Sequence, residues 1–235
     1  MRRILGNLFG EDDFAGRRTT QPRAALETAA RMGALLRVFA REGDRLWLPA
    51  PVDPELAPGL ILETGPLRDL PPAGEVLAWC ETAEAMAHRG GPRPASAISL
   101  DAPLQDLLWR LPTPPPAVVA TVHHRGFHLQ AAREIGCALP GARMVDSIAE
   151  LAGRTLPRSW VLKAPLSASG RNRYIERNGP GLADPKARRT VERLFEVHGA
   201  LLFEPWMERI ADFGVSVILT SQELRIVGIH GQRVD

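Results

Sequence analysis

The most informative segment of the chain reads Trp160-Val161-Leu162-Lys163-Ala164-Pro165-Leu166-Ser167-Ala168-Ser169-Gly170-Arg171-Asn172-Arg173. An apolar run ends at Lys163, and a loop of small residues follows. Small residues such as Gly170 let backbone N–H groups approach an anion, and the hydroxyls of Ser167 and Ser169 add donors. Lys163 supplies a point charge, and the two arginines that close the loop, Arg171 and Arg173, can neutralise phosphate oxygens. The segment predicts a phosphate-binding loop that lacks the order of a Walker A motif; a β-hairpin with a polar turn is the alternative.

Lys163 is also unusual because the chain contains very little lysine. Of the 29 basic residues, only Lys163 and Lys186 are lysines, and the rest are arginines. Such a bias usually reflects the base composition of the genome rather than a chemical need for arginine. Lys186 follows Asp184-Pro185 and is typical of a solvated residue in the first turn of a helix, whereas Lys163 ends an apolar strand.

A second informative segment reads Leu201-Leu202-Phe203-Glu204-Pro205-Trp206-Met207 and is followed by an acid at Asp212. An adenine ring needs apolar faces, which Trp206 and Met207 can supply, and a backbone acceptor and donor at its edge. Proline keeps its carbonyl, so Pro205 can accept while the Met207 N–H donates. Glu204 ends the strand, and Asp212 can accept from ribose hydroxyls. The alternative is that both large apolar side chains lie in the core.

Together the two segments resemble the ATP-grasp superfamily, over roughly residues 117–235. In that family a lysine on a strand precedes a small-residue loop over the phosphates, and a later strand forms the adenine hinge. The resemblance therefore implies the following ATP contacts: Lys163, Ser167, Ser169, Gly170, Arg171, Glu204, Pro205, Trp206, Met207 and Asp212. It assigns the catalytic role, electrostatic stabilisation of phosphate charge, to Lys163 and Arg171.

The sequence departs from the family pattern in two places. A second nucleotide lysine is absent from the stretch 122–127, where Arg125 is the candidate substitute. The family's magnesium ligands lie near the end of its fold, and the chain stops at Asp235 before such an element, so Mg²⁺ ligands are expected beyond it. We therefore expect a fragment of a longer enzyme, or a truncated copy that cannot complete catalysis. No metal site is predicted here, because His124 and His128 have no third ligand nearby.

Alternating strand and helix patterns predict an α/β (α+β) architecture in two lobes. The proline run at 112–116 marks a boundary between a pre-ATP-grasp-like domain (1–116), with a small parallel sheet, and an incomplete ATP-grasp domain (117–235). Strands are expected at 4–9, 45–48, 60–63, 117–122, 159–163, 174–175, 200–204, 214–220 and 224–229, and helices at 22–39, 75–88, 101–111, 127–136, 146–153 and 185–198.

Bulk composition narrows the class of protein. The 235 residues carry a formal net charge of +2, which gives no sign of a nucleic-acid partner. No apolar run is long enough to span a membrane. Cys80 and Cys137 are expected to be lone buried thiols, and the protein is expected in the cytoplasm. The sequence leaves open whether the protein forms a homodimer.

The resemblance implies an enzyme that uses ATP to activate a carboxylate as an acyl phosphate for attack by an amine or thiol. The sequence does not name the acid or the acceptor. A non-catalytic nucleotide-binding or interaction module is the alternative, and an α/β domain without a nucleotide is a third reading.

Overall fold

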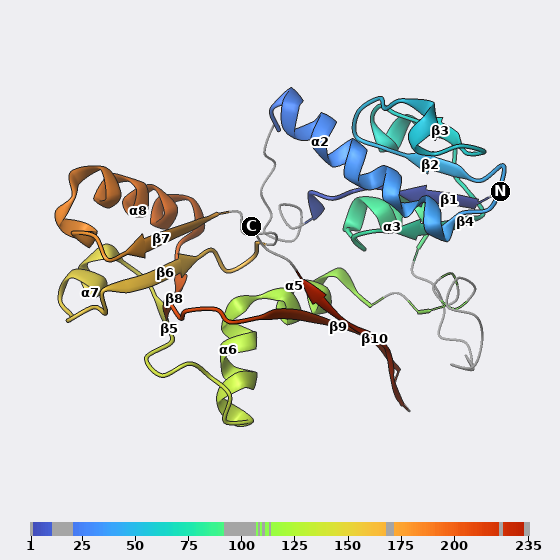
Figure 1. Ribbon diagram of the computed structural model, residues 1–235. Coiled ribbons are helices and arrows are strands. Elements are labelled where there is room, and N and C mark those ends of the chain that lie inside the picture. Colours follow the sequence, from blue (N-terminus) through green and yellow to red (C-terminus); the bar gives the residue numbers. More distant parts are fainter. Residues whose placement is uncertain are drawn as a thin grey trace. The chain divides into compact units, whose positions relative to one another are not determined.

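The computed structural model describes residues 2–10, 21–91, 107, 109, 111–112, 114–167, 172–220 and 223–232 (Figure 1). The chain forms two compact units. The first comprises Met1–Ala132 with Leu166–Arg171, and the second comprises Arg133–Pro165 with Asn172–Asp235. The domain boundary between residues 116 and 117 stays a prediction.

The first unit contains a parallel sheet of four strands in the order β3-β2-β1-β4. Its strands are β1 (Arg2–Leu5), β2 (Arg45–Trp47), β3 (Ile61–Glu63) and β4 (Glu75–Ala78). The predicted small parallel sheet is therefore confirmed, and so is the mixed α and β class of the chain.

Helices cover both faces of this sheet, as a parallel sheet requires. On one face Ile4, Leu46 and Leu48 pack with Ala30 of α2 (Arg23–Gly33). On the other face Leu5 and Val76 pack in a cluster that includes Ala85 of α3 (Ala83–Arg89). Short 3-10 turns complete the connections at η1 (Ala34–Phe39), η2 (Pro54–Leu56) and η3 (Leu67–Asp69).

Two predicted elements of the first half are wrong. The helix expected at 75–88 is a strand, β4, followed by α3, because Val76 and Ala78 alternate into the core beside β1 and Thr82 caps a new helix. The strand expected at 117–122 is helix α5 (Pro116–His123). Pro116 occupies its first turn, where a missing N–H costs nothing, so the prolines begin a helix rather than end one. The helix expected at 101–111 lies largely outside the described residues.

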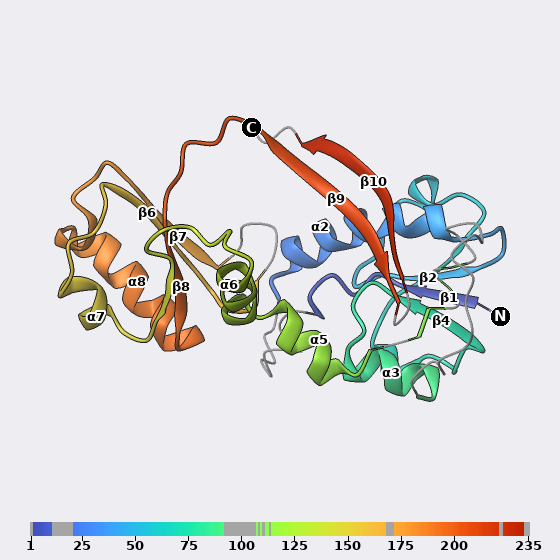
Figure 2. The same cartoon turned by 90° about the horizontal axis from the view of Figure 1, so that it is seen from below.

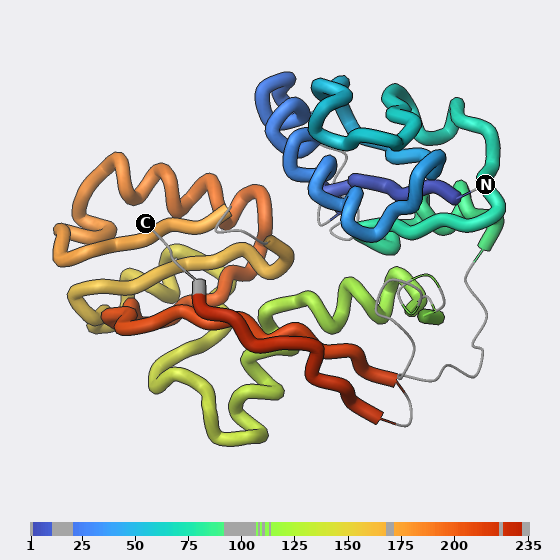
Figure 3. The backbone as a smooth tube through the Cα atoms, turned by 45° about the vertical axis from the view of Figure 1, so that its right-hand side comes forward, coloured from blue at the N-terminus to red at the C-terminus, as the bar shows by residue number. Residues whose placement is uncertain are grey.

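The second unit contains an antiparallel sheet in the order β5-β8-β6-β7. Figure 3 traces the backbone of these segments, which the colour bar locates by residue number. Its strands are β5 (Arg143–Val145), β6 (Ser159–Lys163), β7 (Arg173–Arg177) and β8 (Leu201–Pro205). The accompanying helices are α7 (Ile148–Ala152), the short η4 (Gly181–Ala183) and α8 (Pro185–His198). Helix α6 (Arg125–Glu134) precedes β5. Strand β5 was not predicted, because its three residues carry almost no periodicity.

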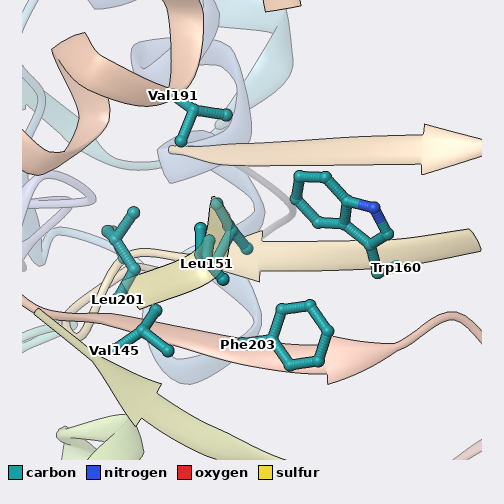
Figure 4. Packing of buried hydrophobic residues seen from close by; sticks show 8 residues of the cluster. Val145, Leu151, Trp160, Val191, Leu201 and Phe203 are labelled. Atoms are coloured by element: carbon teal, nitrogen blue, oxygen red, sulfur yellow. The ribbon is translucent and has the colours of Figure 1, made fainter. Parts of the chain in front are cut away.

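One face of this sheet buries the core of the unit. Trp160, Phe203 and Leu201 gather there with Leu151 of α7 and Val191 of α8 (Figure 4). The rings of Trp160 and Phe203 lie 6.0 Å apart between centroids. Asp184 fixes the start of α8 by accepting from the N–H groups of Lys186 and Ala187. The core therefore holds β6 and β8 side by side with a set register.

The chain ends in a separate two-stranded ribbon of β9 (Asp212–Leu219) and β10 (Leu224–Gln232), which run antiparallel side by side (Figure 2). Alternation along the strands gives the ribbon one apolar face. The side chains of that face are 46% to 71% exposed: Phe213, Val215, Val217, Leu219, Leu224, Ile226 and Ile229. Among the described residues, no helix combines the length and apolar character needed to cross a bilayer.

Candidate functional site

The candidate site lies on the face of the second sheet that points away from its core. In β6, Trp160 and Leu162 belong to the core, so Lys163 points to the opposite face. In β8, Phe203 belongs to the core, so Glu204 points to the same face as Lys163. We call this surface the Lys163 face; it also carries the apolar side chains Met144, Val161, Ile175 and Leu202.

Lys163 and Glu204 form an ion pair across the two strands. The ammonium Nζ donates to the Oε2 atom of Glu204. The register places Leu202 directly opposite Lys163, so the pair is diagonal on the sheet. Both side chains are part-buried, at 30% and 18% exposure, and the pair is therefore less screened than a surface ion pair.

A second cation adjoins the pair. Arg173 of β7 lies directly opposite Lys163 in the register, and its side chain is exposed. Two like charges at directly opposed positions of an antiparallel pair destabilise the sheet. A polyanion bound between Lys163 and Arg173 would remove that repulsion. The residue types alone indicated Arg173 as a loop cation, but only the register shows that it faces Lys163.

The backbone that follows Glu204 hydrogen-bonds to β6 along one of its two edges. The N–H of Trp206 donates to the carbonyl of Ser159 at 2.9 Å, which extends the ladder between β8 and β6. Backbone groups of alternate strand residues point to opposite edges, so the carbonyl of Pro205, the last residue of β8, points away from β6. On that side β5 pairs only as far as Phe203. Met207 is 54% exposed.

Trp206 and Asp212 have arginine partners that sequence reasoning missed. The guanidinium of Arg177 lies 4.8 Å from the centroid of a Trp206 ring, and that of Arg209 lies 5.6 Å away. Arg209 also pairs with Asp212 at 3.2 Å. Trp206 is therefore stacked on cations rather than buried in the core. The signal for Arg177 was available, since Arg173, Ile175 and Arg177 alternate along one face of β7.

The predicted phosphate loop connects β6 to β7, and its ends are tied together. The Ala164 N–H donates to the carbonyl of Asn172 at 3.0 Å. Arg125, the first residue of α6, donates from Nη2 to the carbonyl of Ser167 at 2.9 Å. Arg125 and Ser167 are thus brought together, whereas Ser169, Gly170 and Arg171 lie outside the described residues. The strands on either side do form a β-hairpin, which is compatible with both readings of this segment.

Tyr174 and Glu176 hold β7 in place from the core side. The Tyr174 hydroxyl donates to Glu176 at 2.8 Å, and the other carboxylate oxygen accepts from the Gly179 N–H at 3.0 Å. Burial, together with the hydrogen bond and charge of Glu176, raises the pKa of Tyr174 to about 12. Tyr174 therefore stays protonated and keeps donating at neutral pH. Within the described part of the chain, no group of three or more His, Cys, Asp or Glu side chains could hold a metal ion.

Comparison with solved structures defines the class of fold. No protein-family model matches the sequence, and no curated protein sequence matches it. Three solved structures align with 100% of this chain: an ADP complex of N5-carboxyaminoimidazole ribonucleotide synthetase (13% identity, TM-score 0.54), the Staphylococcus aureus N5-carboxyaminoimidazole synthetase with ADP (9%, 0.55) and the N5-carboxyaminoimidazole ribonucleotide synthetase of Thermus thermophilus (16%, 0.52).

These enzymes have the ATP-grasp fold, and this chain has an ATP-grasp-like fold. The match covers 54% of the first neighbour and 55% of each of the other two, so the chain spans about half their length. Identities of 9% to 16% establish the fold and do not establish a shared substrate.

Proposed function

We propose that this chain binds the adenine nucleotide ATP or ADP on the Lys163 face. The observation that carries the proposal is the placement of Lys163, with Glu204 diagonal to it and Arg173 directly opposite, where β6 enters a loop of small residues. Two cations at the mouth of such a loop attract a polyphosphate. The ADP complexes of two structural neighbours support the choice of nucleotide.

The segment after β8 supplies the adenine and ribose contacts in this proposal. In this proposal the carbonyl of Pro205 accepts from the edge of the adenine ring and the N–H of Met207 donates to it. Trp206 and Met207 offer apolar surface for the ring. Asp212 accepts from the ribose hydroxyls once its pair with the exposed Arg209 opens. An exposed pair of this kind contributes at most about 1 kcal/mol, so a ligand can displace it.

The loop residues provide the phosphate contacts. Ser167 and Ser169 donate from their hydroxyls, the backbone at Gly170 approaches the phosphate oxygens, and Arg171 adds a charge. Arg125 holds the first loop residue by its contact with the Ser167 carbonyl and adds positive charge of its own.

The reaction we propose for the enzyme is activation of a carboxylate. A carboxylate oxygen attacks the γ-phosphorus of ATP, ADP leaves, and an acyl phosphate forms. An amine or thiol then attacks the carbonyl carbon and releases phosphate. Lys163 and Arg171 stabilise the negative charge that develops on the phosphoryl oxygens, without transferring a proton. Mg²⁺, if bound with the nucleotide, would neutralise part of the same charge.

Titration with ADP tests the proposal directly. We expect saturable binding, because the Lys163 face presents the two cations Lys163 and Arg173 beside the hinge segment. Lys163→Met should weaken ADP binding about tenfold or more, since a charge-assisted contact to phosphate is lost. Lys186→Met is the matched control, because Lys186 is exposed on α8 and should not affect binding. Equal ADP binding by both variants, or none by the unaltered chain, would reject the proposal.

A non-catalytic interaction module is a second candidate, and one observation favours it. The ribbon of β9 and β10 presents an exposed apolar face, and surfaces of this kind mark protein interaction sites. This candidate predicts association with another polypeptide and no ATP turnover in the presence of Mg²⁺, carboxylate and amine.

A further inference from the structure

We infer that the carboxylate of Glu204 positions the ammonium of Lys163 for the nucleotide phosphates rather than binding adenine itself. The inference rests on the proposed function and changes the role that the sequence pattern assigns to Glu204. It follows from the direct contact between the Glu204 Oε2 atom and the Lys163 Nζ atom.

The geometry of the sheet explains why Lys163 needs a fixed partner. A lysine side chain has four rotatable bonds and a large rotamer entropy, so on its own it samples many positions. Arg173 directly across on β7 repels the ammonium toward the other side of β6. Glu204 lies on the other neighbouring strand, β8, and attracts the ammonium toward the middle of the Lys163 face.

The backbone of the hinge segment and the side chain of Glu204 therefore have different roles in nucleotide binding. Adenine recognition needs only the carbonyl of Pro205 and the N–H of Met207, which belong to the main chain. The ladder contact between Trp206 and Ser159 holds the backbone between these two groups, and it does not involve the Glu204 carboxylate. Removing the charge of Glu204 should therefore disturb the phosphate end of the site and leave the adenine end unchanged.

A nucleotide comparison separates the two roles. In Glu204→Gln the side chain keeps its shape, and we expect the Kd of ADP to rise about fivefold while the Kd of adenosine is unchanged. In Lys163→Met the same pattern should appear, and the double variant should be no worse than Lys163→Met alone. Glu208→Gln, which removes an exposed acid of the same segment, is the matched control and should bind both ligands normally.

The two-lysine composition adds a readout that needs no nucleotide. In a chain labelled with ¹³C-lysine, only Lys163 and Lys186 give side-chain signals. We expect the Lys163 side chain to be restricted and the Lys186 side chain to be mobile. Glu204→Gln should make Lys163 as mobile as Lys186, whereas Glu208→Gln should leave both signals unchanged.

The possible results distinguish failure of the proposed function from failure of the positioning role of Glu204. Absence of ADP binding by the unaltered chain rejects the proposed function. ADP binding that Glu204→Gln leaves unchanged, or weakens equally for ADP and adenosine, overturns the positioning role while the proposed function stands. A Lys163 signal that is already as mobile as that of Lys186 also overturns it.

Discussion

The guanidinium of Arg125 donates a hydrogen bond to the backbone carbonyl of Ser167, at 2.9 Å and across 42 residues of sequence. The contact fixes the first residue of the predicted phosphate loop to the start of α6. A loop end that is held in place loses less conformational entropy when it closes on a ligand. Arg125 can therefore affect nucleotide binding by fixing the loop as well as by its charge.

Replacement of this arginine tests its contribution to the phosphate end of the site. Arg125→Gln should weaken ADP binding roughly fivefold, because a charge-assisted contact is lost, and leave adenosine binding unchanged. Calorimetric titration of both ligands measures the difference. Arg188→Gln removes an exposed arginine of α8 and serves as the control. Unchanged ADP affinity in Arg125→Gln would show that the contact is irrelevant to binding.

A buried charged network in the first unit predicts a dependence of stability on pH. Arg3, which is 0% exposed, donates to Glu63 at 2.6 Å and to the ring Nε2 of His88 at 2.6 Å. Only a neutral imidazole can accept from a guanidinium. Burial, and then the charge of Arg3, lower the pKa of His88 below 6.5.

The direction of the pH dependence of stability follows from proton linkage. Unfolded His88 binds a proton more readily than folded His88, so the contribution to stability is complete above pH 6.5 and is lost as the pH falls toward the lower folded pKa. Urea unfolding followed between about pH 5 and 8 should show this loss. His88→Gln, whose amide oxygen can still accept from Arg3, should be less sensitive to pH in that range. An unchanged pH profile in this variant would contradict the assignment.

Glu63 extends the same argument to lower pH. Burial acts to raise the pKa of Glu63, but hydrogen bonds from Arg3 and Arg45 and their charges bring the pKa below 4.5. The contribution of Glu63 is therefore present above pH 4.5 and is lost as the pH falls through the folded pKa. The free energy of unfolding of the first unit should accordingly fall more steeply with decreasing pH below pH 4.5. Glu63→Gln should remove this second phase of the pH dependence.

Two phenylalanines offer a matched test of the second unit. Phe203 is 1% exposed in the core, whereas Phe213 on β9 is 71% exposed. Phe203→Ala should cost about 3–5 kcal/mol of unfolding free energy through transfer and cavity terms. Phe213→Ala should change it by less than about 0.5 kcal/mol. Chemical unfolding of both variants, followed by tryptophan fluorescence, compares them; similar losses would mean that Phe213 is buried in solution.

The exposed face of β9 and β10 predicts association of the isolated chain. Val217 and Ile226 are opposed in the register and are 50% and 58% exposed. The double variant Val217→Lys, Ile226→Glu should reduce binding of an apolar fluorescent dye and any self-association, because it places an ion pair within the apolar face. Ser216→Lys on the opposite face is the control. Equal dye binding by all three proteins would exclude this face as its site.

Much of the second unit could be predicted from local sequence. The pattern Ser159 to Lys163 marks a strand with the boundaries that the structure has, and Asp184-Pro185 marks the start of α8. Caps and apolar periodicity act within a few residues, so they can be read locally. The fold class was predictable for the same reason, since alternating strands and helices already indicate it. The segment 117–122 was misread because a short run of β-branched residues is ambiguous until its proline start is weighed.

The contacts within the site depended on tertiary structure. Local sequence identified Lys163 and Glu204 as chemically apt residues, but not as partners, because they lie 41 positions apart. Strand order and register decide which side chains share a face, and the sheet sets both through packing of Trp160 and Phe203. The same register opposes Arg173 to Lys163 and brings Arg177 of β7 to Trp206. Pairings of this kind arise from packing between distant segments, which no short-range pattern records.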